Sequence, residues 1–300
     1  MPRLRRVLSA ALVVAAVIVA GYAALVALVW WSQERIVFQS PAGFVDDAAV
    51  FAQKVNYRAA DGQQLYAYLV APARGRLVDR PPGAPPDGER VAQPRGLLIV
   101  FHGNADVAGS WTQWALRASR HTGYAVLVPE YRGYAGLPGT PTYEGSRLDA
   151  RAAYAFARDS LGVRPSDVAI YGHSLGSAIG AELAAEVRPR ALLLEAPFTS
   201  ARAMARLIVA RPVVALWRVI SRVHYDTEAR VRELEAPVHV VHGDRDGVIP
   251  VHMGHAVHAA ARERGALLVV HGAGHNDVHE TGGGDYWQWL ERALGSAAEP

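Results

Sequence analysis

The stretch VAIYGHSLG, residues 168–176, decides the fold of this chain. Its first four residues form an apolar run typical of a buried strand, and SAIGAELAAE, which begins at residue 177, is typical of a helix. The turn between them has the pattern G-x-S-x-G, and it must be so tight that side chains two residues before and after the serine would collide. Gly172 and Gly176 occupy these two places. The segment therefore predicts a strained turn that exposes the hydroxyl of Ser174 above a sheet, as a candidate nucleophile.

The helix expected after this turn adds an electrostatic feature. Its N-terminus presents free backbone N–H groups and the positive end of the helix dipole. The N–H of Leu175 is therefore a candidate donor to an oxyanion. His173 stands next to Ser174 in the sequence, but a residue adjacent to the serine points away from it in this turn. We therefore interpret His173 as a wall or hydrogen-bonding residue and not as a base.

Outward from this turn, short apolar runs alternate with helical patterns along most of the chain. The runs lie at 96–101, 124–128, 168–171, 191–194, 238–241 and 266–270. Apolar runs divided by amphipathic segments predict a parallel sheet with helices on both faces. Before them, 55–59 and 65–70 flank a turn signal and predict a hairpin. Residues 198–236 are longer than one crossover helix needs, and their helical spacing predicts a small helical cap over the carboxyl end of the sheet.

Two later loops offer partners for a serine nucleophile, which needs a base and a carboxylate that orients the base. GDRDGVIP (243–250) and GAGHND (272–277) each follow an expected strand. Both loops should therefore emerge at the carboxyl edge, where ligands bind in open α/β sheets. The first loop holds two candidate acids, Asp244 and Asp246, and the second holds the candidate base His275.

Other titratable residues compete for these roles. Glu195 ends another expected strand, and we interpret it as a structural hydrogen-bond partner of neighbouring loops. His271 and His279 flank His275 and are the alternative bases. The histidines at 252, 255 and 258 have helical spacing, but no carboxylate completes a recognisable metal-ligand set with them. We expect a solvated helix face there, no bound metal and no cofactor.

Six segments of the chain resemble the α/β-hydrolase family, and in particular its membrane-anchored branch near the prolyl-oligopeptidase-like serine hydrolases. They are FHGNA (101–105), YRGY (131–134), GHSLG (172–176), EAPF (195–198), HGDRD (242–246) and GHN (274–276). The resemblance extends from about Val55 to Leu294, apart from residues 73–95. It implies the α/β-hydrolase fold for residues 55–295, with a mostly parallel eight-stranded sheet flanked by helices.

The resemblance also implies roles for particular residues. Its pattern H-G-x-x-D places the acid at the second aspartate, Asp246, and its pattern G-H-N places the base at His275. The H-G-N-A loop places the second oxyanion N–H at Asn104 or Ala105, of which we favour Asn104. Glu130 stands where relatives usually carry an aspartate before Y-R-G, and we expect this departure not to touch the triad.

The N-terminus predicts a membrane anchor. Residues 7–31 contain no charge, and this run is longer than the roughly 20 apolar residues that span a bilayer as a helix. The apolar stretch of a secretory signal, the main alternative, usually has about 7–15 residues. Arginines at 3, 5 and 6 precede the run, so the positive-inside rule predicts a cytoplasmic N-terminus (1–6) and an extracytoplasmic catalytic domain.

Three further segments complete the predicted domain organisation. Residues 32–54 are expected to connect the anchor to the domain. Residues 73–95 are rich in Pro, Gly and Arg, and we expect a flexible, solvent-exposed insertion. Residues 296–300 are expected to form a C-terminal tail.

Composition excludes several classes of function. Hydrophobic residues make up 51% of the chain, which is enough for a substantial folded core. The three N-terminal arginines account for the whole formal charge of +3, so the rest of the chain is balanced and lacks the charge pattern of a nucleic-acid partner. Cysteine is absent, which excludes disulfides, thiolate catalysis and Cys-bound metals.

Together these patterns predict a serine hydrolase that acts on a small-molecule or lipid acyl substrate. Because the nucleophile is serine, we expect cleavage of an ester, thioester or amide, and a carboxylic ester is the leading substrate. A peptidase or an acyltransferase could use the same triad. A membrane-tethered binding protein, the non-enzymatic alternative, would have no reason to retain Ser174, Asp246 and His275 together. The sequence does not predict an oligomeric state.

Overall fold

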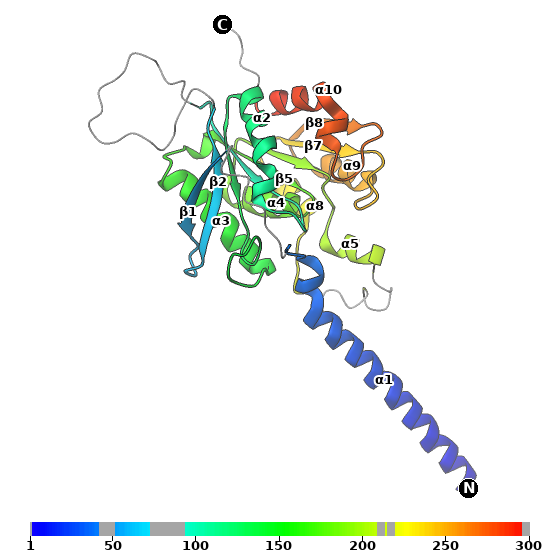
Figure 1. Ribbon diagram of the computed structural model, residues 1–300. Helices are drawn as coiled ribbons and strands as arrows, with labels where there is room; N and C mark the ends of the chain where they lie inside the picture. The colour runs from blue at the N-terminus through cyan, green and yellow to red at the C-terminus, as the bar shows by residue number, and fades with distance from the viewer. Residues whose placement is uncertain (1, 42–51, 73–93, 209–213, 215–219, 296–300) are drawn as a thin grey trace, which may run out of the picture.

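The computed structural model describes residues 2–41, 52–72, 94–208, 214 and 220–295. Helix α1 (Pro2–Val37) projects from a domain that contains the rest of the described chain (Figure 1). The insertion predicted at 73–95 lies outside the described residues except for its last two positions, and so does the tail predicted at 296–300.

The domain is built on one eight-stranded sheet, in the order β1-β2-β4-β3-β5-β6-β7-β8. The strands are β1 (Gln53–Arg58), β2 (Gln64–Val70), β3 (Leu97–Phe101), β4 (Ala125–Pro129), β5 (Val168–His173), β6 (Ala191–Glu195), β7 (Val238–Gly243) and β8 (Arg264–Val270). β1 pairs antiparallel with β2, and β2 pairs antiparallel with β4. The pairs from β4 to β8 are parallel. The predicted mostly parallel eight-stranded sheet is confirmed.

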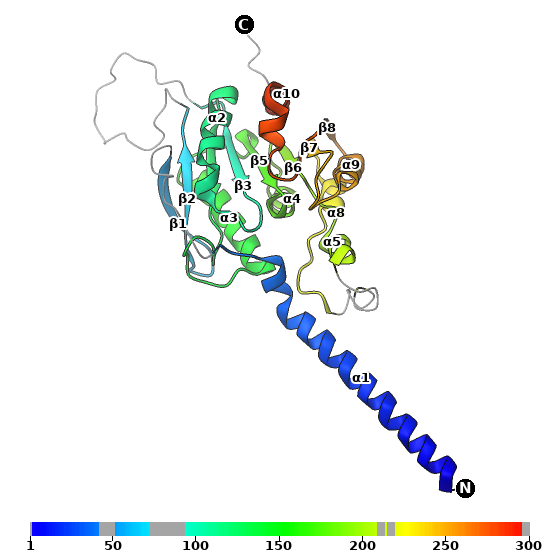
Figure 2. The ribbon, with the colours of Figure 1, turned by 45° about the vertical axis from the view of Figure 1, so that its right-hand side comes forward.

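Helices cover both faces of this sheet (Figures 1 and 2). The remaining helical elements are η2 (Ala108–Trp111), α2 (Thr112–Thr122), α3 (Tyr143–Asp159), η3 (Pro165–Asp167), α4 (Leu175–Val187), α5 (Ala201–Ile208), α8 (Thr227–Glu233), α9 (Val251–Ala260) and α10 (Val278–Ala293). α2 and α10 contact one another on one face, while α3, α4, α8 and α9 form a connected row on the other.

Each face of the sheet has its own hydrophobic core, and β3 contributes to both. Leu97 and Ile99 belong to one buried cluster, and Leu98 and Val100 belong to the other. Successive side chains of a strand point to opposite faces, so a strand covered on both sides must be apolar at every position. This requirement explains why the central strands read as continuous apolar runs and not as alternating ones.

Helix α1 is long and apolar enough to cross a membrane. Over residues Arg5–Val37 its mean hydropathy reaches 2.8, and that apolar window is not buried against the domain at all. The helix includes the run predicted at 7–31 but continues to Val37 without a break. The first part of the predicted connector at 32–54 is therefore helical, and its last two residues already belong to β1.

The region predicted as a helical cap, 198–236, divides into two parts. α5 has no buried residue, and its Leu207 and Ile208 are exposed. α8 instead packs against α4 and α9, and its Val231 is fully buried. α8 is thus the crossover helix between β6 and β7 and not part of a cap, so the prediction of a cap reaching residue 236 is too long. Residues 209–213 and 215–219 lie outside the described residues.

Candidate active site

The turn between β5 and α4 has very little space. A Cβ atom added to Gly172 would lie 2.2 Å from the carbonyl oxygen of Gly176, and one added to Gly176 would lie 2.0 Å from the carbonyl oxygen of Phe101. Ser174 itself has φ 53° and ψ −117°, a sparsely populated conformation for a residue with a side chain. Such strain persists only where the surrounding structure enforces it, and here β5 and α4 do so from the two sides.

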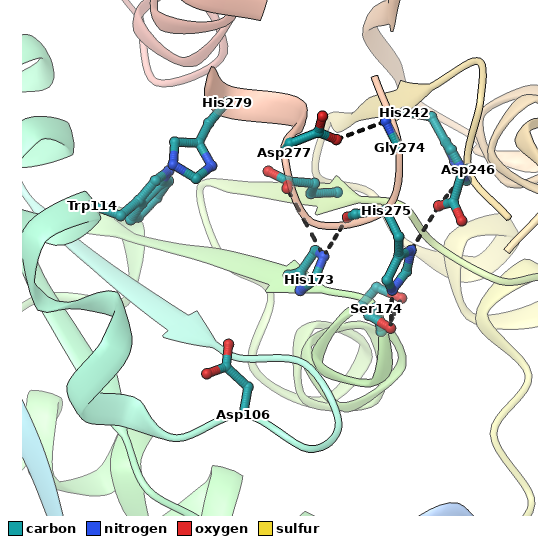
Figure 3. A network of polar contacts seen from close by, with 12 residues as sticks. Asp106, Trp114, His173, Ser174, His242, Asp246, Gly274, His275, Asp277 and His279 are labelled. Carbon is teal, nitrogen blue, oxygen red and sulfur yellow. Dashed lines mark hydrogen bonds and ion pairs between the residues drawn. The ribbon is translucent and has the colours of Figure 1, made fainter. Parts of the chain in front are cut away.

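Three side chains from three loops meet at this turn (Figure 3). Nε2 of His275 lies 2.9 Å from Oγ of Ser174, and Nδ1 of His275 lies 2.7 Å from Oδ2 of Asp246. An ionised carboxylate can only accept a hydrogen bond, so Nδ1 carries the ring proton and Nε2 accepts the proton of the serine hydroxyl. The structure therefore brings together the three residues predicted as nucleophile, base and acid.

The surroundings of Asp246 keep its carboxylate charged. Burial alone would raise the pKa of Asp246, but hydrogen bonds from His242, from His275 and from the N–H of Ile249 outweigh burial and lower this pKa below its ordinary value of 3.8. Nε2 of His242 lies 2.9 Å from the carbonyl oxygen of Ile249 and 3.2 Å from Oδ2 of Asp246, so it carries a proton that both oxygens share. A charged Asp246 can hold His275 in the tautomer that leaves Nε2 free to take a proton.

The competing acid and the competing bases occupy other positions. Asp244 contacts Nδ1 of His271, whose side chain is 90% exposed, and also accepts the N–H of Gly272. His279 packs against Tyr286, with ring centroids 6.0 Å apart. Asp244 and His271 therefore make a surface pair of their own, separate from the contact between Asp246 and His275.

His173 supports the loop that carries His275. Its Nε2 donates to the carbonyl oxygen of His275 at 3.1 Å, and the two rings lie 5.0 Å apart (Figure 3). Burial lowers the pKa of His173, so its ring stays neutral near pH 7. Glu195 accepts hydrogen bonds from the hydroxyls of Tyr171 and Tyr286 and lies 4.0 Å from Nε2 of His173. Both residues act as hydrogen-bonding supports around the site.

The loop after β3 is held by a buried ion pair that sequence reasoning missed. Nε2 of His102 lies 3.0 Å from Oε1 of Glu130, and both side chains are fully buried. Burial alone would lower the pKa of His102, but the charge of Glu130 outweighs it and raises that pKa. Glu130 also accepts the N–H groups of Ala108 and Tyr131, at 2.9 and 3.1 Å. The only signal in the sequence was that Glu130 departs from the family pattern.

The two predicted oxyanion donors start from neighbouring strands. Leu175 is the first residue of α4, so its N–H belongs to the turn whose N–H groups have no partner within the helix. Asn104 follows β3, which pairs directly with β5, and the next residue, Ala105, has a φ of 55°. Both donors therefore emerge at the sheet edge that carries Ser174, as an oxyanion site requires.

Within the described part of the chain, no group of three or more His, Cys, Asp or Glu residues could hold a metal ion. The three histidines of α9 have other surroundings. His252 and His255 are exposed, and Nε2 of His258 lies 2.9 Å from the carbonyl oxygen of Gly265.

Comparisons with known proteins identify the family. Residues 97–223 match the family described as the alpha/beta hydrolase family. An uncharacterized protein of Mycobacterium tuberculosis is 31% identical over 270 residues, which cover 89% of this chain and 89% of that protein. The chain belongs to the α/β-hydrolase superfamily. The superfamily and the fold that the sequence motifs predict are thereby confirmed.

Two further similar α/β hydrolases have names that describe an activity. A lysophosphatidylserine lipase of Mus musculus is 27% identical over 192 residues, which cover 58% of this chain and 47% of the lipase. The structure of an esterase of Pyrococcus furiosus matches with a TM-score of 0.60 at 15% identity, and the match covers 85% of this chain and 99% of the esterase. The likeness to the esterase shows the shared α/β-hydrolase fold. With this family and this fold, the chain is a hydrolase.

Proposed function

We propose that this protein is a membrane-anchored serine hydrolase that cleaves carboxylic esters through an acyl-enzyme on Ser174. The observation that carries the proposal is the hydrogen-bond relay from Oγ of Ser174 through the ring of His275 to Asp246, with lengths of 2.9 and 2.7 Å. The relay supplies the nucleophile, the base and the orienting acid that acyl transfer needs.

The proposed reaction has two halves. Nε2 of His275 takes the hydroxyl proton of Ser174 while Oγ bonds to the ester carbonyl carbon, and the carbonyl electron pair moves onto its oxygen. The N–H groups of Leu175 and Asn104 stabilise that oxyanion. The ester C–O bond then breaks, and the leaving alcohol takes the proton from His275. In the second half His275 takes a proton from water, and the resulting hydroxide attacks the acyl carbon. The proton on His275 then passes to Oγ of Ser174 as the acyl C–O bond breaks, which releases a carboxylic acid and restores Ser174.

The position of α1 favours a substrate that is held in a membrane. Val37, the last residue of α1, lies six residues beyond Trp31, which ends the apolar run, and this corresponds to about 9 Å along a helix. The carbonyl oxygen of Val37 is 2.6 Å from Nδ2 of Asn104. The side chain of Asn104 therefore lies within about 12 Å of the apolar part of the helix.

Two observations support acyl lipids as the substrate class. α5 lies beside the domain end of α1 in both views (Figures 1 and 2), and its Leu207 and Ile208 are exposed, so this short helix offers apolar surface near the point where α1 leaves the domain. The relative from Mus musculus is named a lysophosphatidylserine lipase. A single-chain lipid with its ester carbonyl at the bilayer surface would reach Ser174 with a short displacement.

A graded series of acyl esters tests this function. We expect the full-length protein in liposomes to hydrolyse single-chain esters, with kcat/KM rising about fourfold for each added methylene that becomes buried, because such burial contributes about 0.8 kcal/mol. Ser174→Ala is the control for background hydrolysis. A preference for the matched amides, or for short water-soluble esters over longer ones, would contradict the proposed substrate class.

We further propose that α1 stays in the membrane with its N-terminus in the cytoplasm and the domain outside. The protein should then sediment with membranes, resist extraction by carbonate or high salt, and be digested by protease added to spheroplasts or right-side-out vesicles. A cytoplasmic marker protein, which should survive the protease, is the control. A soluble mature protein that starts near Ala24 would show that the helix is cleaved off. A membrane-bound protein that resists the protease until the membrane is lysed would show that the domain faces the cytoplasm.

A further inference from the structure

The end of α1 is part of the domain, although the rest of this helix is not. The apolar window of α1 makes no buried contact with the domain, but one residue near its C-terminal end and the residue directly after it are buried. Gln33 is 6% exposed, and Phe38, directly after the helix, is 5% exposed and belongs to the core cluster on the α4 side of the sheet. The chain therefore enters the core within a few residues of the predicted span.

This buried end holds the side chain of Asn104 from both sides. Nδ2 of Asn104 donates to the carbonyl oxygen of Val37 at 2.6 Å, and the backbone N–H of Gln39 donates to Oδ1 of Asn104 at 2.8 Å. The hydroxyl of Tyr134 donates to the same Oδ1 at 2.8 Å. Asn104 is thus fixed by three hydrogen bonds, and two of them come from residues 37–39.

The same end of α1 also binds a second part of the domain. Nε2 of Gln33 donates to the carbonyl oxygen of Ile220 at 2.6 Å, and Oε1 of Gln33 accepts the N–H of Arg222 at 2.7 Å. Glu34 forms an ion pair with Arg222 at 2.8 Å, and the Arg222 guanidinium lies 5.0 Å from the ring centre of Trp30. These contacts with residues 220–222 fix the end of α1 against the domain. Residues 37–39 therefore have a fixed position from which to hold Asn104.

We propose that the end of the membrane helix positions the active site: residues 37–39 hold the side chain of Asn104, and this sets the direction of the backbone N–H that receives the oxyanion. The inference rests on the proposed function. Donors in such a site must already point to the position that the oxyanion will occupy, because a small displacement of an N–H group removes most of its stabilisation of the oxyanion. The neighbouring Ala105, with its φ of 55°, is a strained residue that needs such external support. Asn104 is a positioning residue through its side chain, separate from the role of its N–H.

A comparison of oxygen and sulfur substrates tests the inference. In a thionoester the carbonyl oxygen is replaced by sulfur, a weak hydrogen-bond acceptor, so the ratio of ester to thionoester turnover reports on the oxyanion donors. We expect this ratio to fall about tenfold in Asn104→Ala, which keeps the backbone N–H but loses its support. Phe38→Ala, which loosens residues 37–39 from the core, should lower the ratio in the same direction. Arg35→Ala, at an exposed residue of α1 outside the segment that holds Asn104, should leave the ratio unchanged.

The ratio separates positioning from folding and from the proposed function itself. A variant that only reduces the folded fraction lowers both turnover rates equally and leaves the ratio as in the wild type. An unchanged ratio in Asn104→Ala, or in Phe38→Ala, overturns the inference. Failure of the proposed function has a different result, namely ester hydrolysis by full-length Ser174→Ala or none by the wild type.

Discussion

Ser174→Ala should reduce ester turnover by about 10⁶-fold, to the background rate, while the protein stays folded. Alanine has no hydroxyl, so His275 has no proton to take and no covalent intermediate can form. Turnover of a single-chain ester by the full-length protein in liposomes measures the effect. Thermal unfolding of the two proteins should show that the substitution does not destabilise the fold, because it removes only one oxygen atom from the turn.

Ser166→Ala is the matched control for this substitution. Ser166 is an exposed serine of η3 that lies before β5, and its removal should leave turnover unchanged. Residual turnover in Ser174→Ala close to the wild-type rate would mean that another group is the nucleophile. Equal losses in both variants would point to a general defect of the protein and not to the hydroxyl of Ser174.

Asp246→Asn should lower kcat by roughly 10⁴-fold with little change in the fold. An asparagine amide can turn its NH₂ group toward Nδ1 of His275, and this favours the tautomer that carries its proton on Nε2. That tautomer cannot take the proton of Ser174. The lowered pKa of Asp246 means that the wild-type carboxylate is ionised at every pH above its ordinary value of 3.8, so its protonation should not limit activity between pH 5 and 8.

Asp244→Asn separates the two aspartates of the same loop. Asp244 contacts His271 at the surface, where solvent screens the interaction, and it does not contact His275, so turnover should change less than about tenfold. Steady-state kinetics of the two variants side by side give the ranking. A larger loss of turnover in Asp244→Asn than in Asp246→Asn would show that Asp244, and not Asp246, is the acid.

The local motifs predicted the sheet and the meeting of Ser174 and His275 with the loop of Asp244 and Asp246, because each motif is tied to the end of a strand. The choice of Asp246 over Asp244 came from the resemblance to the family. Apolar runs define parallel strands, parallel strands end at one edge, and the loops that follow must lie together there. The pattern G-x-S-x-G adds a steric reason for the two glycines, and the distances at Gly172 and Gly176 agree with it. The sequence alone could therefore place His275 close to Ser174, which is 101 positions away, and to Asp246, which is 29 positions away.

The contacts of α1 could not be predicted in this way. The bond from Gln39 to Asn104 joins residues 65 positions apart, and the bond from Gln33 to Ile220 joins residues 187 apart. Neither contact involves a strand end or a periodic pattern, and an uncharged helical run gives no sign of where its polar end will dock. The pairing of Glu130 with His102 was missed for a related reason, because a buried ion pair leaves no local pattern in the sequence.

Mass spectrometry of the protein after reaction with a fluorophosphonate tests the central claim most directly. The reagent should add one phosphonyl group to the wild-type protein, and tandem spectra should place it on Ser174 within the peptide that contains GHSLG. His275→Ala should slow this reaction strongly, because the base that activates the hydroxyl is gone. An adduct on any other residue, or undiminished labelling of Ser174→Ala, would contradict the assignment of Ser174 as the nucleophile.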